Sequence, residues 1–532
     1  MAASDSLVVA VDVGSGSARA AVVDGGGHIL GRGAQVILLN RPATDHAEHS
    51  STDIWLAVCT AVRRAVAGSK VQPARIRGIG FDATCSLVLL DATGAPASVS
   101  TSGEDRWNVV MWADHRAVAE ADEITRLGHR VLEYVGGVMS PEMEIPKLLW
   151  LKRHLPRQWP RYARAFDLAD FLVWRASGNV AISACTVTCK WTFLNHETIG
   201  WQRDFLAAVG LDDLPQRAAL PDKVAQLGGT AGLLSTTAAA ELGLTTDCHV
   251  GVGIIDAHAG GLGVLGGVDW GTLDRRVALI AGTSTCHMAV SAKPRSIPGV
   301  WGPYYGAMMP GLWLNEGGQS ATGSLLEHIL DWHAEGRALG GDRHGVVTAR
   351  IEALLAEQGP RFAAGLMVLP DFHGNRSPLA DPQARGVIHG LGMASGPDSL
   401  AELYYATALG IVFGTRHILD AMNRAGYAVD TLHLTGGHVA NPLLVRLYAD
   451  ATGCNVVLPA EPDGVLVGTA ALAAAACGLY PSLAASAGAM ARSGREVAPD
   501  ASLARVLDAR YRAFLVMHEQ RQHLDELLHQ AV

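Results

Sequence analysis

Charged residues are scarce in this chain, and none of them gathers into a basic tract. Asp, Glu, Lys and Arg make up 17% of the 532 residues, and the formal net charge is −9. Nucleic acids and anionic membranes bind mainly through clustered Lys and Arg, so neither is an expected partner. The first residues, MAASDSLVV, lack the basic start of a secretory signal. No run approaches the roughly 20 apolar residues of a membrane span, so the expected compartment is the cytoplasm.

Cysteine is sparse as well, with eight residues scattered along the chain. The closest pair, Cys185 and Cys189, does not have the spacing of a usual zinc motif. Reduced thiols are therefore the expectation. The length of the chain exceeds what one hydrophobic core serves, so two or more domains are expected.

Two short turns rich in glycine and hydroxyl side chains each separate a pair of apolar segments. The first reads Gly-Ser-Gly-Ser at 14–17, and the second reads Gly-Thr-Ser-Thr at 282–285. Each stands near the start of one half of the chain, which indicates a duplicated domain with two loops facing one cleft. The copies differ where Asp12 of the first corresponds to Ile280 of the second. Only the first loop therefore offers a carboxylate that would sit near Mg²⁺.

Three other structures compete with a phosphate loop for the first turn. A dinucleotide-binding loop needs G-x-G-x-x-G, but after Gly14 and Gly16 the chain continues Ser17, Ala18 and Arg19, so the third glycine is missing. The sequence contains no G-x-x-x-x-G-K-[ST], which excludes a P-loop. A plain hairpin turn explains one copy as well as a phosphate loop does. The second copy favours the phosphate loop.

Strand and helix patterns alternate in the first hundred residues, which predicts an α/β layer fold. A helix is expected near 51–67, followed by strands at 76–81 and 87–90, and residues 114–220 have a mostly helical pattern.

A polar, turn-like stretch, GGVDWGTLDRR at 266–276, is the expected domain boundary or hinge. We therefore predict one lobe over 1–267 and a second over 277–532. Near the end of the chain, 502–528 has apolar residues at near-helical spacing, which predicts an amphipathic helix packed on the second lobe or on a partner subunit. These residues are Val506, Leu507, Phe514, Leu515, Leu524, Leu527 and Leu528.

Eight segments of the chain resemble motifs of the FGGY carbohydrate kinases and occur in the order of that family. They are DVGSGSARA (12–20), GIGFDATCSLVLLD (78–91), MWADHRA (111–117), GVGIIDAHAGG (251–261), AGTSTC (281–286), EGGQSATG (316–323), FHGNRSPLADPQARGVIHGL (372–391) and TGGHVANPLLVRLYADATGCNVV (435–457). The resemblance implies an α/β, two-lobed, duplicated ribonuclease H-like fold, as in the actin, Hsp70 and hexokinase ATPases, with a central cleft. FDATCS and EGGQSATG look most like the ribulokinase branch, and like its D-ribulose kinases.

The resemblance implies an ATP-dependent kinase that uses Mg²⁺ and phosphorylates the terminal hydroxyl of a ketopentose. D-ribulose is the sugar that the branch favours, with D-ribulose 5-phosphate as product. L-ribulose, xylulose and ribitol are alternatives within the same chemistry. The competing class is a non-enzymatic nucleotide switch with the same fold, which would need no acceptor pocket. A homodimer is an expectation that rests on the family alone.

A sugar kinase must remove a proton from the acceptor hydroxyl and neutralise charge on the γ-phosphate. Asp256 matches the family's catalytic base, although an Asp that opens a helix can also be an N-cap. Asp12 resembles the carboxylate near the metal, and His258 is expected only to pack or cap. The implied nucleotide-binding residues are Gly14, Ser15, Ser17 and Arg19 at the γ-phosphate, Gly282 and Thr283 at the β-phosphate, and Gln319, Gly436, Gly437 and Asn441 elsewhere on the nucleotide.

The sugar pocket is the other half of the implied site. Its expected residues are Asp82, Ala83, Lys190, Asp256 and Glu316. A carboxylate such as Glu316 can accept hydrogen bonds from two adjacent sugar hydroxyls. Asp82 has an alternative explanation as a turn carboxylate at a strand end. Small residues on both sides of Asp256, Gly253 and Ala257–Gly261, would let the substrate approach. Asp114 and Arg116 are expected to form an internal ion pair that supports the pocket.

Overall fold

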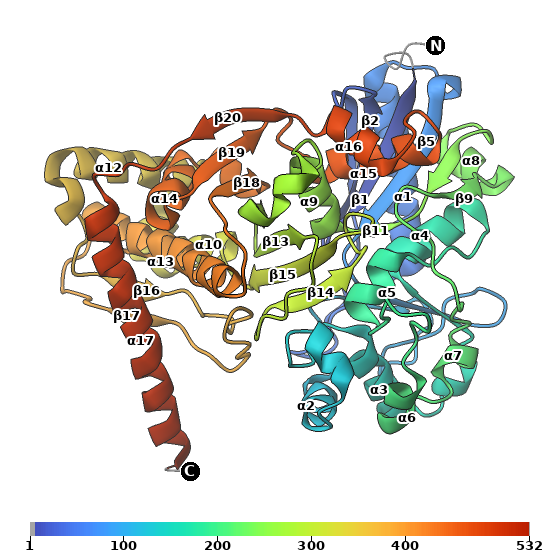
Figure 1. Ribbon diagram of the computed structural model, residues 1–532, viewed down its shortest axis with the longest axis horizontal. Helices are drawn as coiled ribbons and strands as arrows, with labels where there is room; N and C mark the ends of the chain where they lie inside the picture. Colours follow the sequence, from blue (N-terminus) through green and yellow to red (C-terminus); the bar gives the residue numbers. More distant parts are fainter. Residues whose placement is uncertain (1–5, 531–532) are drawn as a thin grey trace.

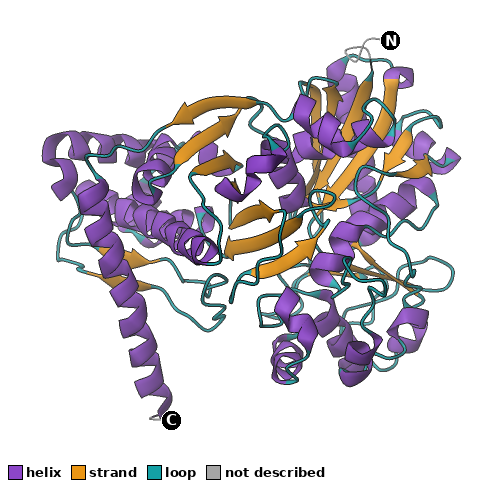
Figure 2. Ribbon diagram, viewed as in Figure 1, coloured by secondary structure: helices purple, strands orange, loops and turns teal. Residues whose placement is uncertain are grey.

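The computed structural model describes residues 6–530 and has two lobes, each built on a seven-stranded mixed sheet (Figures 1 and 2). The first sheet has the order β3-β2-β1-β5-β10-β9, with β11 paired to β5. Its strands are β1 (Leu7–Val13), β2 (Ser17–Asp24), β3 (Ile29–Val36), β5 (Ile76–Ala83), β9 (Thr230–Leu233), β10 (His249–Gly251) and β11 (Ile254–Ile255).

The second sheet has the order β14-β15-β13-β12-β18-β19-β20. Its strands are β12 (Arg276–Ala281), β13 (Thr285–Ser291), β14 (Trp301–Tyr305), β15 (Trp313–Gln319), β18 (Thr431–Thr435), β19 (Asn455–Pro459) and β20 (Ser493–Val497). In both sheets an antiparallel hairpin is extended by a further antiparallel strand, and its first strand pairs in parallel with a later one: β1 with β5, and β12 with β18. The shared connectivity confirms the predicted duplicated ribonuclease H-like fold.

Helix α1 (Ser51–Ser69) shows how the sequence builds the first layer. The Ser50 side chain caps its start by accepting a hydrogen bond from the Asp53 backbone N–H at 3.3 Å. Its apolar side packs on β2 and β3, where Gly33 leaves the necessary room, because a Cβ there would lie 2.1 Å from the Ala61 carbonyl oxygen. The helix expected near 51–67 is therefore confirmed.

The first lobe also contains short helices and a small four-stranded sheet. The helices are α2 (Val118–Arg126), α3 (Glu144–His154), α4 (Leu168–Ser177), α5 (Ala184–Lys190), α6 (Arg203–Ala208), α7 (Leu214–Arg217) and α8 (Thr236–Leu242). The sheet consists of β4 (Glu48–His49), β6 (Leu87–Leu90), β7 (Val109–Val110) and β8 (Arg164–Asp167). The mostly helical pattern predicted for 114–220 agrees with these elements.

The second lobe packs several helices that follow β15 around its sheet, and it also has a two-stranded ladder. The helices are α10 (Gly323–Trp332), α11 (Ala334–Ala338), α12 (Arg343–Gln358), α13 (Pro397–Arg424) and α14 (Pro442–Thr452), and the ladder joins β16 (Met367–Leu369) to β17 (Val387–His389). Across residues 6–530, none of the helices combines the length and apolarity needed to cross a membrane.

Two helices from late in the chain lie on the first lobe. Helices α15 (Gly464–Ala476) and α16 (Leu483–Met490) are drawn in orange-red over the blue strands in Figure 1. Their apolar residues belong to the hydrophobic core that also contains β1 and β5. Gly78 permits this packing, since a Cβ there would lie 2.7 Å from the Ala473 carbonyl oxygen. The first core therefore includes residues from both predicted lobe ranges.

The stretch expected to be a hinge is mostly a 3-10 helix, η5 (Trp270–Arg275). Backbone hydrogen bonds of 3.1 Å from Ala428 to Asp274 and 3.0 Å from Asp430 to Arg275 attach it to the second lobe. Rotation of the lobes would therefore have to leave η5 with the second lobe.

The predicted C-terminal helix is α17 (Ala504–Gln530), and only its first half follows the prediction. Leu507 and Phe514 are buried in the core of the second lobe. Leu524, Leu527 and Leu528 are exposed, and the end of the helix extends away from the lobe (Figure 1).

Candidate active site

Three carboxylates meet where neighbouring parallel strands of the first sheet end. Asp12 near the end of β1 is paired in register with Asp82 of β5. On its other side, β5 pairs with β11, which places Ile254 opposite Asp82. Asp256 follows directly after β11 as the first residue of α9 (Asp256–Leu265). The carboxyl ends of parallel strands in open α/β sheets are a common place for ligands.

The Asp12–Asp82 pair is buried and has fewer cations than carboxylates. Arg19 forms an ion pair with Asp12, and the Thr469 hydroxyl donates a hydrogen bond to Asp82. Burial, together with the charge of Asp12, raises the pKa of Asp82 well above its ordinary value, and burial also raises the pKa of Asp12. Oδ1 of Asp82 accepts no hydrogen bond from the described residues. Buried carboxylate oxygens in excess of their donors fit a divalent cation such as Mg²⁺.

Asp256 is held with one carboxylate oxygen on the backbone of its own helix. Its Oδ1 accepts a hydrogen bond of 2.7 Å from the Ala257 N–H. Burial and the nearby charge of Asp12 raise the pKa of Asp256 to about 6, against the lowering effects of that N–H and of His258. The alternative of an N-cap does not hold, because Ile255 occupies the N-cap position and Asp256 is already helical.

The sequence predicted that small residues near Asp256 leave space for a substrate, but the glycines of α9 are closely packed. A Cβ on Gly260 would lie 2.8 Å from Ile280, and a Cβ on Gly261 would lie 2.4 Å from the Met308 sulfur. At Gly263 it would lie 1.8 Å from the Gly464 carbonyl oxygen of α15. The prediction is therefore wrong for Gly260 and Gly261. All three glycines serve close packing against the second lobe and α15.

Glu316 of β15 is the centre of a second buried group of charges. Arg376 forms an ion pair with its Oε1, the Lys190 Nζ lies 4.0 Å from its Oε2, and the His258 Nε2 lies 3.3 Å from the same oxygen. The Lys190 Nζ and the Arg376 guanidinium lie 4.1 and 3.9 Å from the ring centre of Trp301. Gly318, the second glycine of EGGQ, makes room for the Arg376 side chain, because a Cβ on Gly318 would lie 2.8 Å from the Arg376 Cδ.

The cations decide the ionisation of this group. Burial alone would raise the pKa of Glu316, but Lys190, Arg376 and His258 outweigh it and hold that pKa well below its ordinary value. Glu316 is therefore an ionised acceptor in a largely buried place. Both Asp12 and Glu316 act electrostatically on Asp256, so Asp256 lies within reach of both groups.

The first glycine turn is a hairpin turn, and one side of its backbone is not covered by neighbouring atoms. The Gly14 N–H donates to the Ser17 carbonyl at 3.1 Å, which closes the turn between β1 and β2. The Ser15 hydroxyl accepts a hydrogen bond of 2.8 Å from the Trp112 indole. A Cβ on Gly16 would meet no atom within 4 Å, so this turn leaves space beside its backbone.

The second turn is fastened to the EGGQSATG segment. The Thr283 carbonyl accepts from the Thr322 N–H at 2.9 Å, and the Gly282 carbonyl accepts from the Gly323 N–H at 3.0 Å. A Cβ on Gly282 would meet no atom within 4 Å, which repeats the open side of the first turn. Gly436, with φ of 91°, packs so closely that a Cβ would lie 2.5 Å from the Ala281 carbonyl oxygen. The TGGH turn therefore lies against this second loop.

Two residues expected near the nucleotide have structural partners. The Asn441 Oδ1 caps α14 by accepting from the Leu443 and Leu444 N–H groups, at 3.1 and 3.3 Å. The Gln319 amide donates to the Ile411 carbonyl at 3.0 Å and accepts from the Thr415 hydroxyl at 3.1 Å. These contacts tie β15 to α13, and a role for Asn441 or Gln319 in nucleotide binding stays a prediction.

The expected internal ion pair of Asp114 and Arg116 is confirmed. The Arg116 Nε lies 2.8 Å from Asp114 Oδ1, and its Nη2 lies 2.9 Å from Glu48 Oε1, all of them buried. Ala83 is fully buried next to Asp82, between Val13 and Ile255 in the sheet register.

Models of one protein family match both halves of the chain. The N-terminal domain of the FGGY family of carbohydrate kinases matches residues 7–263, and the C-terminal domain of that family matches residues 277–477. The chain belongs to the FGGY family of carbohydrate kinases. It is therefore a sugar kinase, a phosphotransferase that uses ATP as donor.

Relatives of this FGGY kinase extend over nearly its whole length. An FGGY carbohydrate kinase domain-containing protein of Homo sapiens is 43% identical and covers 97% of either chain. A D-ribulokinase of Saccharomyces cerevisiae is 38% identical over 88% of this chain and 71% of its own length. A ribulokinase of Geobacillus thermodenitrificans is 30% identical over 88% of this chain and 86% of its own.

Solved structures agree with the fold of this FGGY kinase. A xylulose kinase from Rhodospirillum rubrum superposes with a TM-score of 0.78 at 24% identity, covering 97% of this chain and 99% of that one. A gluconate kinase from Lactobacillus acidophilus gives a TM-score of 0.79 at 20% identity, with 97% and 98% coverage.

Some residues of the site lie outside the residue set predicted from sequence. Arg376 and Trp301 contact the Glu316 group, and Thr469 contacts Asp82. Arg376 lies inside a segment that resembles the family, but nothing in its spacing pairs it with Glu316. Thr469 lies 387 positions from Asp82 in the chain, so only the packing of α15 on the first lobe brings them together.

Proposed function

We propose that this FGGY kinase transfers the γ-phosphoryl group of ATP to the terminal hydroxyl of D-ribulose, giving D-ribulose 5-phosphate. The observation that carries the proposal is the pair of carboxylates Asp256 and Glu316. One has its pKa raised to about 6 by burial and Asp12, and the other is kept ionised by buried cations. A nucleotide switch needs no such second group beside its phosphate loops.

Asp256 acts as the general base in this proposal. It accepts the proton of the sugar hydroxyl as that oxygen attacks the γ-phosphate. A base is most effective when its pKa lies near the working pH, and such help contributes roughly 10²–10⁴-fold to the rate. The hydrogen bond from the Ala257 N–H fixes one oxygen of the carboxylate, so the other is free to face the substrate.

Glu316 and Lys190 hold the sugar in this proposal. An ionised carboxylate can accept hydrogen bonds from two adjacent hydroxyls, which suits a polyol chain. Lys190 offers N–H donors from the same buried group, and Arg376 keeps Glu316 charged and in place. Ala83 remains a proposed part of the pocket wall.

The two glycine turns bind the phosphates in this proposal. Gly14, Ser15, Ser17 and Arg19 serve the γ-phosphate side, and Gly282 and Thr283 serve the β-phosphate side, with Gln319, Gly436, Gly437 and Asn441 toward the nucleoside. Asp12 would hold Mg²⁺. Asp82, which the sequence predicted for the sugar pocket, fits beside Asp12 instead, because its contacts are with Asp12 and Thr469. Bound Mg²⁺ supplies charge neutralisation on the phosphates.

The choice of D-ribulose rests on the relatives and on the branch motifs. The yeast D-ribulokinase is 38% identical, whereas the xylulose and gluconate kinase structures are at most 24% identical and support the fold alone. L-ribulose, xylulose and ribitol differ from D-ribulose in configuration or oxidation state, and they are the competing substrates.

A substrate panel tests the proposal. Ketopentoses, pentitols and hexoses are compared at fixed Mg-ATP by coupled detection of ADP. D-ribulose is expected to give the highest kcat/KM, with L-ribulose and ribitol lower and aldohexoses poor. A preference for glycerol or an aldohexose would contradict the assignment of D-ribulose and leave the sugar kinase activity standing.

A further inference from the structure

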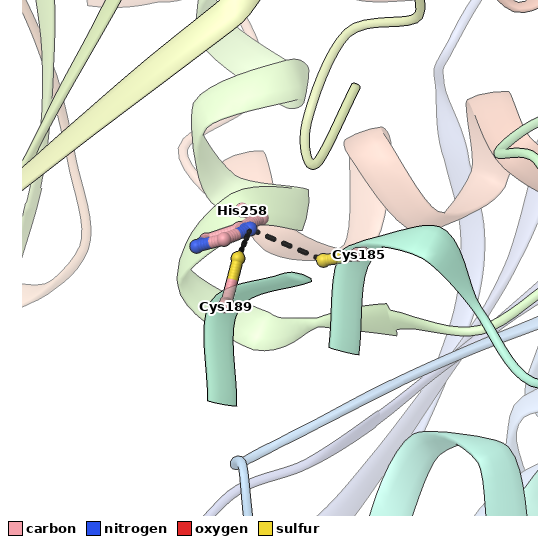
Figure 3. A group of neighbouring side chains, drawn as sticks. All are labelled: Cys185, Cys189 and His258. Atoms are coloured by element: carbon pink, nitrogen blue, oxygen red, sulfur yellow. Dashed lines mark hydrogen bonds between the residues drawn. The ribbon is translucent and has the colours of Figure 1, made fainter. Parts of the chain in front are cut away.

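Two thiols and one imidazole meet in a fully buried place behind Glu316. Cys185 and Cys189 lie one turn apart on α5, and His258 lies on α9 (Figure 3). Both sulfurs face the same ring nitrogen: the Cys185 Sγ lies 3.1 Å and the Cys189 Sγ 3.9 Å from the His258 Nδ1. All three side chains have zero exposure.

We propose that Cys185, Cys189 and His258 bind one tetrahedral metal ion of the Zn²⁺ class. The three ligand atoms lie within 4.8 Å of one another. In a tetrahedral zinc site with Zn–S near 2.3 Å and Zn–N near 2.0–2.1 Å, a sulfur and a nitrogen are about 3.6 Å apart. The two observed S···N distances fall on either side of that value. The ligands need only small movements to surround an ion.

A fourth oxygen ligand is close by. The Ala307 carbonyl oxygen, in the loop after β14, lies 3.4 Å from the same Nδ1. Two thiolates, one imidazole and one oxygen complete a four-coordinate site with donors that Zn²⁺ accepts. The other nitrogen of the His258 ring faces the Glu316 Oε2 at 3.3 Å. A carboxylate on the second nitrogen is the usual partner of a metal-binding histidine, because it fixes the ring and its tautomer.

Binding of an ion would fix the protonation of the group. Both sulfurs must bind as thiolates and the His258 Nδ1 must carry no proton, so binding releases protons. The remaining ring proton would then be on Nε2, which lies 3.3 Å from the Glu316 Oε2 and would donate to it.

The spacing of the two cysteines alone did not indicate this site. His258 follows Cys189 by 69 positions, and the fold brings α5 and α9 together. Neither cysteine nor His258 takes part in the proposed phosphoryl transfer, so the existence of the metal site does not depend on the proposed sugar. Through His258, however, an ion would fix the orientation of Glu316.

The test uses the full chain produced in cobalt-supplemented minimal medium, because a fully buried site is filled as the protein folds. Cobalt bound by thiolates gives a strong ligand-to-metal absorption in the near ultraviolet and intense tetrahedral bands in the visible region. We expect about one cobalt ion per chain with this spectrum. Protein from zinc-supplemented medium should contain zinc in the same ratio by elemental analysis.

Three variants assign the signal. Cys185→Ser and Cys189→Ser should each lower the bound cobalt by about tenfold or more and abolish the thiolate absorption. Cys59→Ser, at another buried and free cysteine, should leave both unchanged. Absence of bound cobalt and zinc from folded, ATP-binding wild-type protein would overturn the proposal, even if the serine variants fail to fold. So would a cobalt spectrum that Cys185→Ser and Cys189→Ser retain.

Discussion

Asp256 is the residue whose chemistry the structure makes most testable. A general base must be deprotonated to accept the hydroxyl proton, so activity should fall as the pH drops through its pKa. Burial and Asp12 raise that pKa to about 6. We expect kcat/KM, measured with sugar and nucleotide below saturation, to fall tenfold per pH unit below about 6. If the base were a carboxylate with an ordinary pKa, this fall in kcat/KM would begin only below about pH 4.

The matched variant for this profile is Asp256→Asn. It should lower kcat by roughly 10²–10⁴-fold and keep nucleotide affinity close to that of the wild type. Its remaining activity should lack the limb near pH 6. Near-normal turnover in Asp256→Asn, or an unchanged acid limb, would rule out Asp256 as the base.

Asp12 gives a second prediction at the level of single residues. If its carboxylate holds Mg²⁺, Asp12→Ala should raise the Mg²⁺ concentration for half-maximal rate by about tenfold or more, the effect of losing one charged contact. Ile280→Val, at the corresponding position of the second turn, serves as the control and should leave the Mg²⁺ curve unchanged. Titration of Mg²⁺ at fixed ATP measures both. Equal curves for Asp12→Ala and wild type would remove Asp12 from the metal site.

The sequence predicted single residues where a motif fixed them, and it failed where only tertiary structure does. Asp12, Asp82 and Asp256, each assigned to the site through a family motif, lie together at the carboxyl ends of neighbouring strands of the first sheet. Arg376 was not predicted as the partner of Glu316, because ion pairs between distant segments leave no spacing signal. His258, expected only to pack, contacts both Cys185 and Glu316.

At the level of elements, the packing of α9 on α15 is the feature most sensitive to a single methyl group. A Cβ on Gly263 would lie 1.8 Å from the Gly464 carbonyl oxygen. Gly263→Ala should therefore destabilise the protein by about 1–3 kcal/mol through overpacking. The midpoint of urea denaturation measures the change, and activity should fall as well because α9 carries Asp256.

Gly68 provides the matched control for that substitution. It also lies in a helix, α1, but a Cβ there would lie 3.8 Å from its nearest neighbour, the Arg32 carbonyl oxygen. Gly68→Ala should leave stability unchanged or raise it by about 0.5–1 kcal/mol, since alanine favours helix. Equal stability of the Gly263→Ala and Gly68→Ala variants would contradict the close contact of α9 and α15.

The elements were predictable from the sequence to different degrees. Two similar turns at 14–17 and 282–285 indicated a duplication, and the matching connectivity of the sheets confirms it. The prediction that Gly260 and Gly261 leave space for a substrate is wrong, because glycine permits close approach by any partner, including another helix. The return of α15 to the first lobe has no local signal, since its Ala-rich sequence does not specify the core on which the helix packs.

For the whole molecule, the proposed site needs both halves of the chain. Asp256 comes from the first family domain, and Glu316 and Arg376 come from the second. Arg32 of the first sheet also forms ion pairs with Glu461 and Asp463, at 2.6 and 3.0 Å, just before α15. Phosphoryl transfer in this account therefore requires an acceptor bound beside Asp256, whereas a nucleotide switch would turn over ATP without one.

The rate of ADP release from Mg-ATP, with and without D-ribulose, is the most direct test of the proposed sugar kinase mechanism. Without a sugar, Asp256 has no acceptor hydroxyl to deprotonate, so ADP release should be slower by at least about 100-fold, the lower end of the contribution of a general base. With D-ribulose, ADP and D-ribulose 5-phosphate should form in equal amounts. Equal rates of ADP release with and without D-ribulose, and with every other sugar of the panel, would contradict it.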